Sequence, residues 1–406
     1  MHLTIKNKAF LNTEWIHFFV LWGSLFFFIV GSGEGYRTCA YLNVLFVTNY
    51  AITSYKNQGI PWGNTIYILC VPAAYMLLDL ASGSSSDHRI HIYTKLILVA
   101  FLIYGWLIFL NNLETKRTDF FLKSLLVLSC IFVLIQFVVY AFIGTEFIGS
   151  WHFGTFNNPH HLALFILLTA PVLIGFTIHY RNSKSFFLIP LLMISAWLML
   201  KTSSRPAWLG ILVGILVLIP LLSSKTRKIV AFFTLLFSGF FYIVSAQFHD
   251  RVQDLILHIS TEERVDIWKN SYQMLQLNSL SEWIRGHGFD SYPKGYSIFT
   301  NMAGPQYTHP HNFILEILYT SGVLGLLVSG FLYYFLIRNI VNVCRNETNG
   351  HMSNVGKLSL ASFIMLFVHT FLTLPFFSTY NFYVLAILFL TSYYLMNNDF
   401  KLVRLE

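Results

Sequence analysis

The stretch Tyr307–Gly325, YTHPHNFILEILYTSGVLG, decides how the rest of the chain is interpreted. It begins with polar residues, including two histidines on either side of a proline, and becomes apolar within a few residues. His311 is therefore expected where a long extramembrane segment meets the start of a membrane helix. Its imidazole titrates near neutral pH, so it can accept or donate a proton at a water-accessible edge. A simpler interpretation is that His311 only caps a helix start at the interface.

The composition excludes a soluble globular protein. Of 406 residues, 55% are hydrophobic and only 11% are charged, whereas about a quarter of the residues of soluble domains are charged. Backbone groups in lipid must be satisfied internally, so the recurring apolar runs are predicted to be helices rather than barrel strands. We predict an all-α polytopic membrane protein with about 12 transmembrane helices. The predicted spans are residues 15–32, 38–54, 65–83, 92–111, 120–144, 161–180, 186–202, 206–223, 228–247, 312–337, 357–376 and 380–397.

The distribution of basic residues predicts the orientation. An even number of spans leaves both termini on one side of the membrane. If that side is the cytoplasm, 16 of the 26 Lys and Arg residues fall on it, and five of the other ten lie in one long loop that the positive-inside rule discounts. Both termini are therefore predicted to be cytoplasmic, in a bacterial inner membrane. The net charge of +8 then reflects cytoplasmic loops, with membrane lipids and no nucleic acid as partners.

Three regions follow from this topology: residues 1–247 with spans one to nine, residues 248–311 as a large periplasmic loop, and residues 312–406 with the last three spans and a short cytoplasmic tail. A loop this long is usually functional. A second outer loop, about 145–160, carries GSWHFGTFNNPHH, which is polar and rigid enough to line a site. Asn158 and His160 in that loop are candidate supporting residues.

The large loop is predicted to contain one amphipathic helix, from about 261 to 278. Ser260–Glu263 fits a capping box at its start. An apolar stripe at helical spacing is formed by Val265, Trp268, Tyr272 and Leu275, so the helix is expected to lie along the membrane surface. The glycines and prolines from Gly286 to Pro305 are expected to break any regular element before His309.

Lys201-Thr-Ser-Ser-Arg205-Pro206 predicts an anion site on the outer face. Pro206 suits the first position of a helix, which places Arg205 at the N-terminal end of the eighth span. Unpaired backbone N–H groups, the positive end of the helix dipole and a guanidinium then meet at one point. The alternative is an arginine that extends from the membrane to the interface.

Arg264 lies in the first turn of the predicted loop helix, where a cation opposes the helix dipole unless an anion compensates. Glu262 or Glu263 could supply that anion. Alternatively, Arg205, Arg264 and His311 act together on one membrane face. Two cations and a general base suit an enzyme that holds a lipid-linked diphosphate while an acceptor hydroxyl loses its proton in glycosyl transfer.

Other polar residues have competing interpretations. His309 and His311 could suggest a metal site, but no Cys or carboxylate cluster completes one on that face, so neither a metal nor a cofactor is expected. Glu316 within the tenth span and Asp79 within the third are functional candidates because intramembrane carboxylates are costly, although pairing within the helix bundle explains them equally well. Cys39, Cys70, Cys130 and Cys344 are far apart and without CxxC spacing, and are interpreted as core residues.

Several of these residues resemble the motifs of bacterial O-antigen ligases. His311-Asn312, nine residues, then Gly322-Val-Leu-Gly325 resembles the ligase signature without a gap. Ser-Ser-Arg205 at a helix start resembles the first functional arginine of these enzymes, and Glu-Arg264 with Trp268 a turn later resembles the second. Gly154-Thr-Phe-Asn-Asn-Pro159 resembles a stretch of the wider ligase and polymerase superfamily, with His160 where an asparagine is common.

The resemblance implies a metal-independent, inverting glycosyltransferase of the GT-C type with its active site on the periplasmic face. The implied donor is a glycan on undecaprenyl diphosphate, and the implied acceptor is the lipid A–core oligosaccharide. His311 would be the base, and Arg205 and Arg264 would bind the diphosphate, with Asn312 beside the base. His309 has no firm counterpart and ranks below His311. Gly322 and Gly325 are expected to permit close helix packing.

Three other functions remain open. A polymerase of O-antigen or exopolysaccharide would share the fold and the motifs but use a second lipid-linked glycan as acceptor. An oligosaccharyltransferase would move the glycan to protein. A transporter or flippase is disfavoured because ionisable residues at mid-span are few and the polar residues gather on one face.

We expect Arg205→Ala, Arg264→Ala and His311→Ala each to abolish glycan transfer while the protein remains in the membrane. Arg205→Lys should also reduce transfer, because the point charge of an ammonium does not reproduce the forked donor of a guanidinium. Transfer assays on membranes with equal amounts of each variant test this. Full activity in any alanine variant contradicts the role of that residue, and full activity of Arg205→Lys shows that charge alone suffices.

Overall fold

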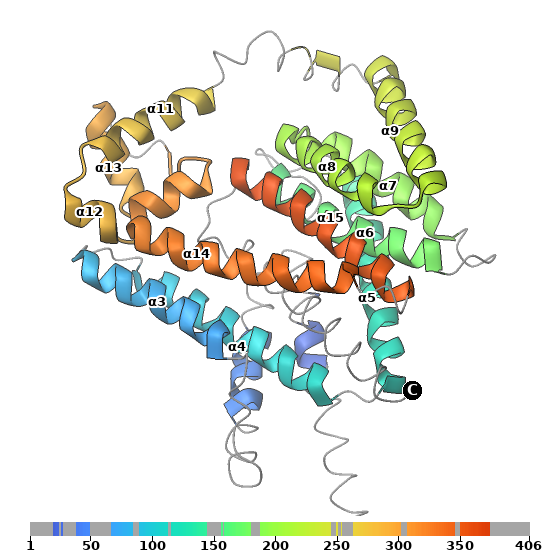
Figure 1. Ribbon diagram of the computed structural model, residues 1–406, viewed down its shortest axis with the longest axis horizontal. Helices are drawn as coiled ribbons and strands as arrows, with labels where there is room; N and C mark the ends of the chain where they lie inside the picture. Colours follow the sequence, from blue (N-terminus) through green and yellow to red (C-terminus); the bar gives the residue numbers. More distant parts are fainter. Residues whose placement is uncertain are drawn as a thin grey trace, which may run out of the picture.

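Figure 1 shows the computed structural model of the protein, in which the regular elements are helices. It describes residues 19–23, 26, 38–48, 66–83, 89–112, 115–143, 156, 158–179, 187–244, 249–250, 253, 263–301, 307–345 and 350–373. Within these ranges there is no β-strand, so the predicted all-α class is confirmed. The predicted span at 380–397 lies outside the described residues, and the first two spans are described only in part.

In the ranges given above, nine helices coincide with predicted spans to within several residues at most ends. They are α3 (Ile66–Ser82), α4 (Arg89–Asn112), α5 (Thr115–Val138), α6 (Pro159–His179), α7 (Leu188–Lys201), α8 (Arg205–Leu218), α9 (Ser224–Val244), α14 (Phe313–Arg345) and α15 (Gly350–Thr373). A π-helical turn, η1 (Val139–Ile143), extends α5, and a 3-10 turn, η3 (Ile219–Leu221), extends α8.

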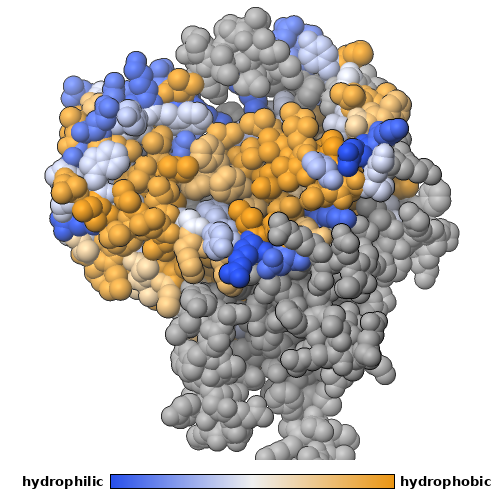
Figure 2. Space-filling view, in the orientation of Figure 1, coloured by the Kyte–Doolittle hydropathy of each residue, from blue (hydrophilic) through white to orange (hydrophobic). Residues whose placement is uncertain are grey.

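Several helices have membrane-spanning character. In the described part of the chain, Phe313–Asn342 is both long and apolar enough to cross a membrane, and eight shorter helical segments of 10–17 residues are apolar. Figure 2 shows a broad hydrophobic surface across the middle of the visible face, with groups of hydrophilic residues at several places around it. Large exposed apolar side chains such as Leu235 on α9 and Leu327 on α14 belong to these helices.

Among the described helices, α8 and α15 share the most extensive contact, near the centre of the molecule (Figure 1). Gly210 and Gly214 form a small-residue pair four positions apart on α8. A Cβ on Gly210 would lie 2.5 Å from the carbonyl oxygen of Met365, and one on Gly214 would lie 3.1 Å from that of Ala361. Backbones can approach this closely only where side chains are absent. Gly214 lies later on α8 than Gly210, but its partner Ala361 lies earlier on α15 than Met365. The two helices are therefore antiparallel, and the start of α8 lies beside the end of α15.

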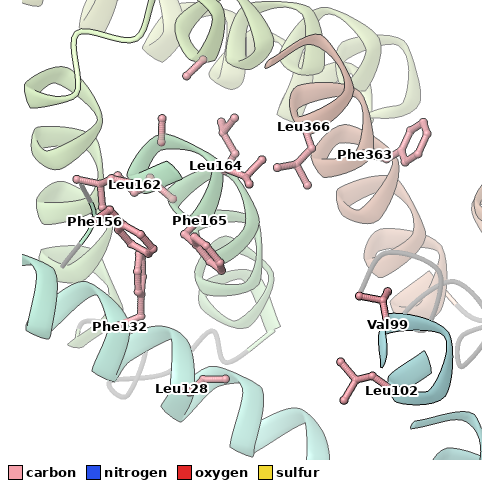
Figure 3. Close-up of a cluster of buried hydrophobic side chains, with 14 of the residues drawn as sticks. Val99, Leu102, Leu128, Phe132, Phe156, Leu162, Leu164, Phe165, Phe363 and Leu366 are labelled. Carbon is pink, nitrogen blue, oxygen red and sulfur yellow. The ribbon is translucent and has the colours of Figure 1, made fainter. Parts of the chain in front are cut away.

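An apolar cluster fixes the start of α6 (Figure 3). Phe156, three residues before α6 begins, is fully buried and stacks on Phe165 of α6 with ring centroids 5.2 Å apart. Phe132 of α5 contacts both rings. Burial of each large aromatic side chain contributes about 1.5–3 kcal/mol. The polar residues that follow Phe156, beginning with Asn158, are therefore held in one place.

The large loop contains more regular structure than the sequence predicts. Three helices are described: α11 (Glu263–Gln276), α12 (Leu280–Arg285) and α13 (Tyr292–Thr300). Gly286 and Gly288 adopt positive φ and end α12, as predicted. The expectation that no element follows was wrong, because Pro293 occupies the second position of α13, where the missing N–H costs nothing.

The apolar stripe predicted for α11 is not the face of the helix that packs against the rest of the protein. The buried face is formed by Ile267, Ser271, Met274 and Leu275. Of the predicted stripe, only Leu275 is buried, while Val265 and Tyr272 are exposed. The buried face packs with aromatic residues of α13 and α14, including Tyr292, Tyr296 and Tyr319, in a second core separate from the main one. The proposed capping residues 260–262 lie outside the described residues.

A kink in α14 joins this loop to the membrane helices. Gly322 has φ 65° and ψ −165°, which interrupts the helical hydrogen bonds. The carbonyl oxygens of Tyr319 and Thr320 accept instead from the backbone N–H groups of His287 and Gly288, at 2.9 and 2.8 Å. Gly286 lies directly against this kink. The prediction that Gly322 permits close packing is confirmed, and the partner is the end of α12.

Asp79 anchors the same segment to α3. Its carboxylate is buried and accepts from the backbone N–H of Phe289 at 2.6 Å and from the hydroxyl of Tyr93 on α4. Arg285 donates to the carbonyl oxygen of Ala81, also on α3, at 2.6 Å. The intramembrane carboxylate considered as a functional candidate therefore holds the large loop on the helix bundle.

We expect Gly322→Ala to lower the free energy of unfolding by about 2 kcal/mol or more, since its backbone region is open almost only to glycine and an added Cβ would lie 2.3 Å from the carbonyl oxygen of Ile284. Gly330→Ala on the same helix is the matched control, because its Cβ would meet no atom within 4 Å. Thermal unfolding of both variants in detergent tests this. Equal midpoints for the two variants would contradict the role of the kink.

Candidate functional site

The starts of α6 and α8 meet at the end of α15. His369 on α15 donates from Nε2 to the carbonyl oxygen of His160 on α6 at 3.0 Å. The Nδ1 atom of His160 lies 3.0 Å from the hydroxyl of Ser204, the residue before α8. These contacts join three segments far apart in the sequence. They place Arg205, the first residue of α8, at this junction.

The segment before α14 meets the same end of α15. His311 Nδ1 lies 3.0 Å from the carbonyl oxygen of Thr373, the last residue of α15, and His309 Nε2 lies 3.2 Å from the same oxygen. A carbonyl oxygen can only accept, so both nitrogens donate. The two imidazole rings lie side by side with centroids 4.2 Å apart.

The hydrogen bond to Thr373 fixes the tautomer of His311. Because Nδ1 carries the proton given to Thr373, Nε2 keeps its lone pair. Among the described residues no hydrogen bond to Nε2 is recorded. His311 also has φ 52°, in the left-handed region that only a few per cent of non-glycine residues adopt. Strained backbone of this kind is concentrated at functional sites.

His309 differs from His311 in its hydrogen bonds. While Nε2 donates to Thr373, Nδ1 lies 2.8 Å from the hydroxyl of Thr308. Both ring nitrogens therefore have partners within the protein. This arrangement supports the lower rank given to His309 from the sequence, with a role in shaping the segment before α14.

Both histidines are neutral near neutral pH. Burial lowers the pKa of His309 to about 4, and the nearby charges of His311 and Arg264 act in the same direction. Burial also lowers the pKa of His311 below 6.5, with Arg264 adding to the effect and the hydrogen bond to Thr373 opposing it. A neutral imidazole with a free lone pair can take a proton from a hydroxyl.

Arg264 lies close to the histidines. The first turn of α11 carries it, and its charge acts on His160, His309, His311 and His369. The neighbouring Glu263 accepts a hydrogen bond from the Tyr307 hydroxyl. That bond raises the pKa of Tyr307 to about 12, so the phenol remains a donor. The contact ties the start of α11 to the segment that carries His311.

The backbone before Arg205 is also strained. Ser203 has φ 51°, and the side chain of Ser204 makes no capping bond to α8 because it contacts His160 instead. Pro206 occupies the second helical position, one residue later than predicted, so Arg205 is itself helical and half-buried. The start of α8 therefore presents a guanidinium at the positive end of the helix dipole.

Three of the predicted supporting residues lie at the starts of helices. Asn158 accepts from the backbone N–H of His160 at 2.8 Å and begins α6. Asn312 accepts from the N–H groups of Ile314 and Leu315, at 3.0 and 3.2 Å, and begins α14. Both act as helix caps, a contact that stabilises a helix by about 1 kcal/mol. Glu316 is buried in the first turn of α14.

Sequence reasoning missed His369 and Thr373, which belong to the predicted span 357–376 and to no motif. The signal that could have identified His369 is an ionisable residue within an apolar span, which is a functional candidate by default. Thr373 acts through its backbone carbonyl, which no sequence pattern marks. In the described part of the chain, no cluster of three or more His, Cys, Asp or Glu residues could hold a metal ion.

The sequence is similar to known proteins in the region that carries these residues. Residues 190–330 match the family model described as O-antigen ligase, a range that includes Arg205, Arg264 and His311. This part of the chain is therefore similar to an O-antigen ligase domain. The chain is also 25% identical over 292 residues to a Rickettsia typhi protein named "putative polysaccharide ligase", covering 68% of this chain and 67% of the relative. A Rickettsia prowazekii protein of the same name is 24% identical over the same length.

The lowered pKa of His311 predicts the pH profile of glycan transfer. With His311 as the expected general base, the neutral imidazole is the active form, so kcat/KM should fall as pH drops through the pKa of His311, with a midpoint below 6.5. Initial transfer rates across the acid range measure this. His287→Asn, a substitution in the loop outside the site, should leave the midpoint unchanged. A midpoint at or above 6.5 contradicts the assignment of His311.

Proposed function

We propose that this protein transfers a glycan from undecaprenyl diphosphate to the lipid A–core oligosaccharide at the periplasmic face of the bacterial inner membrane. His311 is the general base, and Arg205 and Arg264 bind the diphosphate. The reaction uses no metal or cofactor, and the anomeric configuration of the transferred sugar is inverted. The GT-C type of fold and the placement of both termini in the cytoplasm belong to the same proposal.

The orientation of the His311 ring carries the proposal. Nδ1 donates to the Thr373 carbonyl, which leaves Nε2 as the proton acceptor. Burial and the charge of Arg264 keep the ring neutral by lowering its pKa. A base that is already neutral, deprotonated at one defined atom and fixed in position meets the requirements of general-base catalysis.

In the proposed step, the acceptor hydroxyl of the core oligosaccharide gives its proton to Nε2 of His311. Its oxygen attacks the anomeric carbon from the face opposite the diphosphate and forms the new glycosidic bond. The bond from the anomeric carbon to the diphosphate oxygen breaks, and its electron pair stays on that oxygen. The negative charge that develops there is stabilised by the two arginines.

The placement of the two arginines supports diphosphate binding. Arg205 begins α8 next to Ser204, which contacts His160, and the charge of Arg264 acts on His160 as well. The residue before Arg205 and the charge of Arg264 therefore meet at one histidine. The starts of α6, α8 and α14 also meet here, and N-terminal helix ends favour anions.

A polymerase remains the second candidate, because the same base and cations would serve a second lipid-linked glycan as acceptor. The match of residues 190–330 to the O-antigen ligase family and the ligase names of both relatives favour the ligase. An acceptor test decides between the two.

The test uses purified full-length protein in detergent with a lipid-linked glycan donor, with and without lipid A–core, and products resolved on a gel. We expect a discrete shift of the lipid A–core band that requires both substrates and is lost in His311→Ala. The Thr373 contact predicts that His309→Ala retains more activity than His311→Ala, because both ring nitrogens of His309 have hydrogen-bond partners, whereas Nε2 of His311 has none among the described residues.

The alternative outcomes are distinct. A ladder that grows from the donor without lipid A–core identifies a polymerase with the same base. A shift that persists in His311→Ala contradicts the mechanism. No product in either reaction, while a known ligase is active under the same conditions, contradicts glycosyl transfer.

A further inference from the structure

His369 is a fully buried histidine that the proposed chemistry does not use. Its Nε2 atom carries the ring proton, because it donates to the carbonyl oxygen of His160 at 3.0 Å. Nδ1 is then a bare acceptor, and it is buried without a hydrogen-bond partner among the described residues. An unsatisfied buried polar atom costs about 1–3 kcal/mol. A leucine at this position would avoid that cost. The hydrogen bond made by Nε2 is therefore what distinguishes a histidine from an apolar residue here.

The Nε2 bond connects the two halves of the candidate site. On one side, His160 contacts the hydroxyl of Ser204, which directly precedes Arg205. On the other side, His369 lies one helical turn before Thr373, whose hydroxyl donates back to the carbonyl oxygen of His369. The carbonyl of Thr373 in turn orients His311.

We propose that His369 is a positioning residue, whose Nε2–H bond to the His160 carbonyl fixes the start of α8 relative to His311. The proposal rests on the proposed function, because it takes Arg205 as a diphosphate ligand and His311 as the base. The antiparallel crossing of α8 and α15 at Gly210 sets the approximate distance between the two helices. The His369 bond then sets the final alignment of Arg205 with His311, which must act on one substrate.

Such alignment affects the rate more than substrate binding. A displacement of about 1 Å between reacting groups can cost about a hundredfold in rate. The donor would still meet both arginines if α6 moved relative to α15, but the anomeric carbon would no longer lie in line with the hydroxyl activated by His311. Loss of the bond should therefore lower kcat more than it raises the KM for the donor.

Three substitutions separate the bond from the bulk of the side chain. In His369→Gln, the amide nitrogen occupies nearly the position of Nε2 and can donate to the His160 carbonyl. In His369→Asn, the amide lies near the position of Nδ1 and stops short of that carbonyl. His369→Ala removes both. Ser362→Ala, a buried substitution on the same helix away from the site, is the matched control.

The experiment measures kcat and donor KM for these variants with lipid-linked glycan and lipid A–core. We expect His369→Gln to retain kcat within about threefold, whereas His369→Asn and His369→Ala lose about tenfold or more, with smaller changes in KM. Ser362→Ala should match the unsubstituted protein. A His369→Gln protein that folds but is as slow as His369→Ala overturns the proposal, as does unchanged kcat in His369→Ala.

His311→Ala, assayed in parallel, separates the two levels of the argument. If that variant is inactive while the His369 series is uniformly active, the positioning role fails and the proposed function stands. If His311→Ala transfers glycan at the full rate, the proposed function fails and the positioning proposal fails with it.

Discussion

The carbonyl oxygen of Thr373 is the contact on which the candidate site depends. It belongs to the last described residue of α15. It accepts from the ring N–H groups of two histidines, which fixes the ring of His311 and selects the tautomer with Nε2 unprotonated. A backbone acceptor at a helix end thus does the work that a carboxylate does beside many catalytic histidines, and it adds no negative charge that would raise the pKa of His311.

The large loop is positioned by the membrane helices rather than by its own stability. Gly322 breaks α14, and the carbonyl groups released there bind the loop at His287 and Gly288. Asp79 on α3 binds the next residue, Phe289. The second core, around Tyr292 and Tyr319, then holds α11 against α14. Since Arg264 lies in the first turn of α11, these contacts carry it to the segment that contains His311.

Much of the fold could be predicted from the sequence because lipid permits few alternatives. Apolar runs had to be helices, and their limits were accurate for most of the spans that the structure describes. The loop was less predictable. Its helix α11 buries Ile267 and Met274 against aromatic partners from distant segments, and no local period reveals which face those partners cover. Pro293 was misinterpreted as a breaker because proline also begins helices. Motif spacing predicted roles for His311, Arg205 and Arg264, but it did not indicate Thr373, whose carbonyl has no sequence signature.

The most direct test of this account is an experimental structure of the full-length protein in a lipid nanodisc with undecaprenyl diphosphate bound. The account predicts density for the diphosphate between the guanidinium groups of Arg205 and Arg264, with Nδ1 of His311 on the Thr373 carbonyl and Nε2 facing the ligand. A diphosphate bound away from the end of α15, or a His311 ring turned so that Nε2 contacts Thr373, would contradict it.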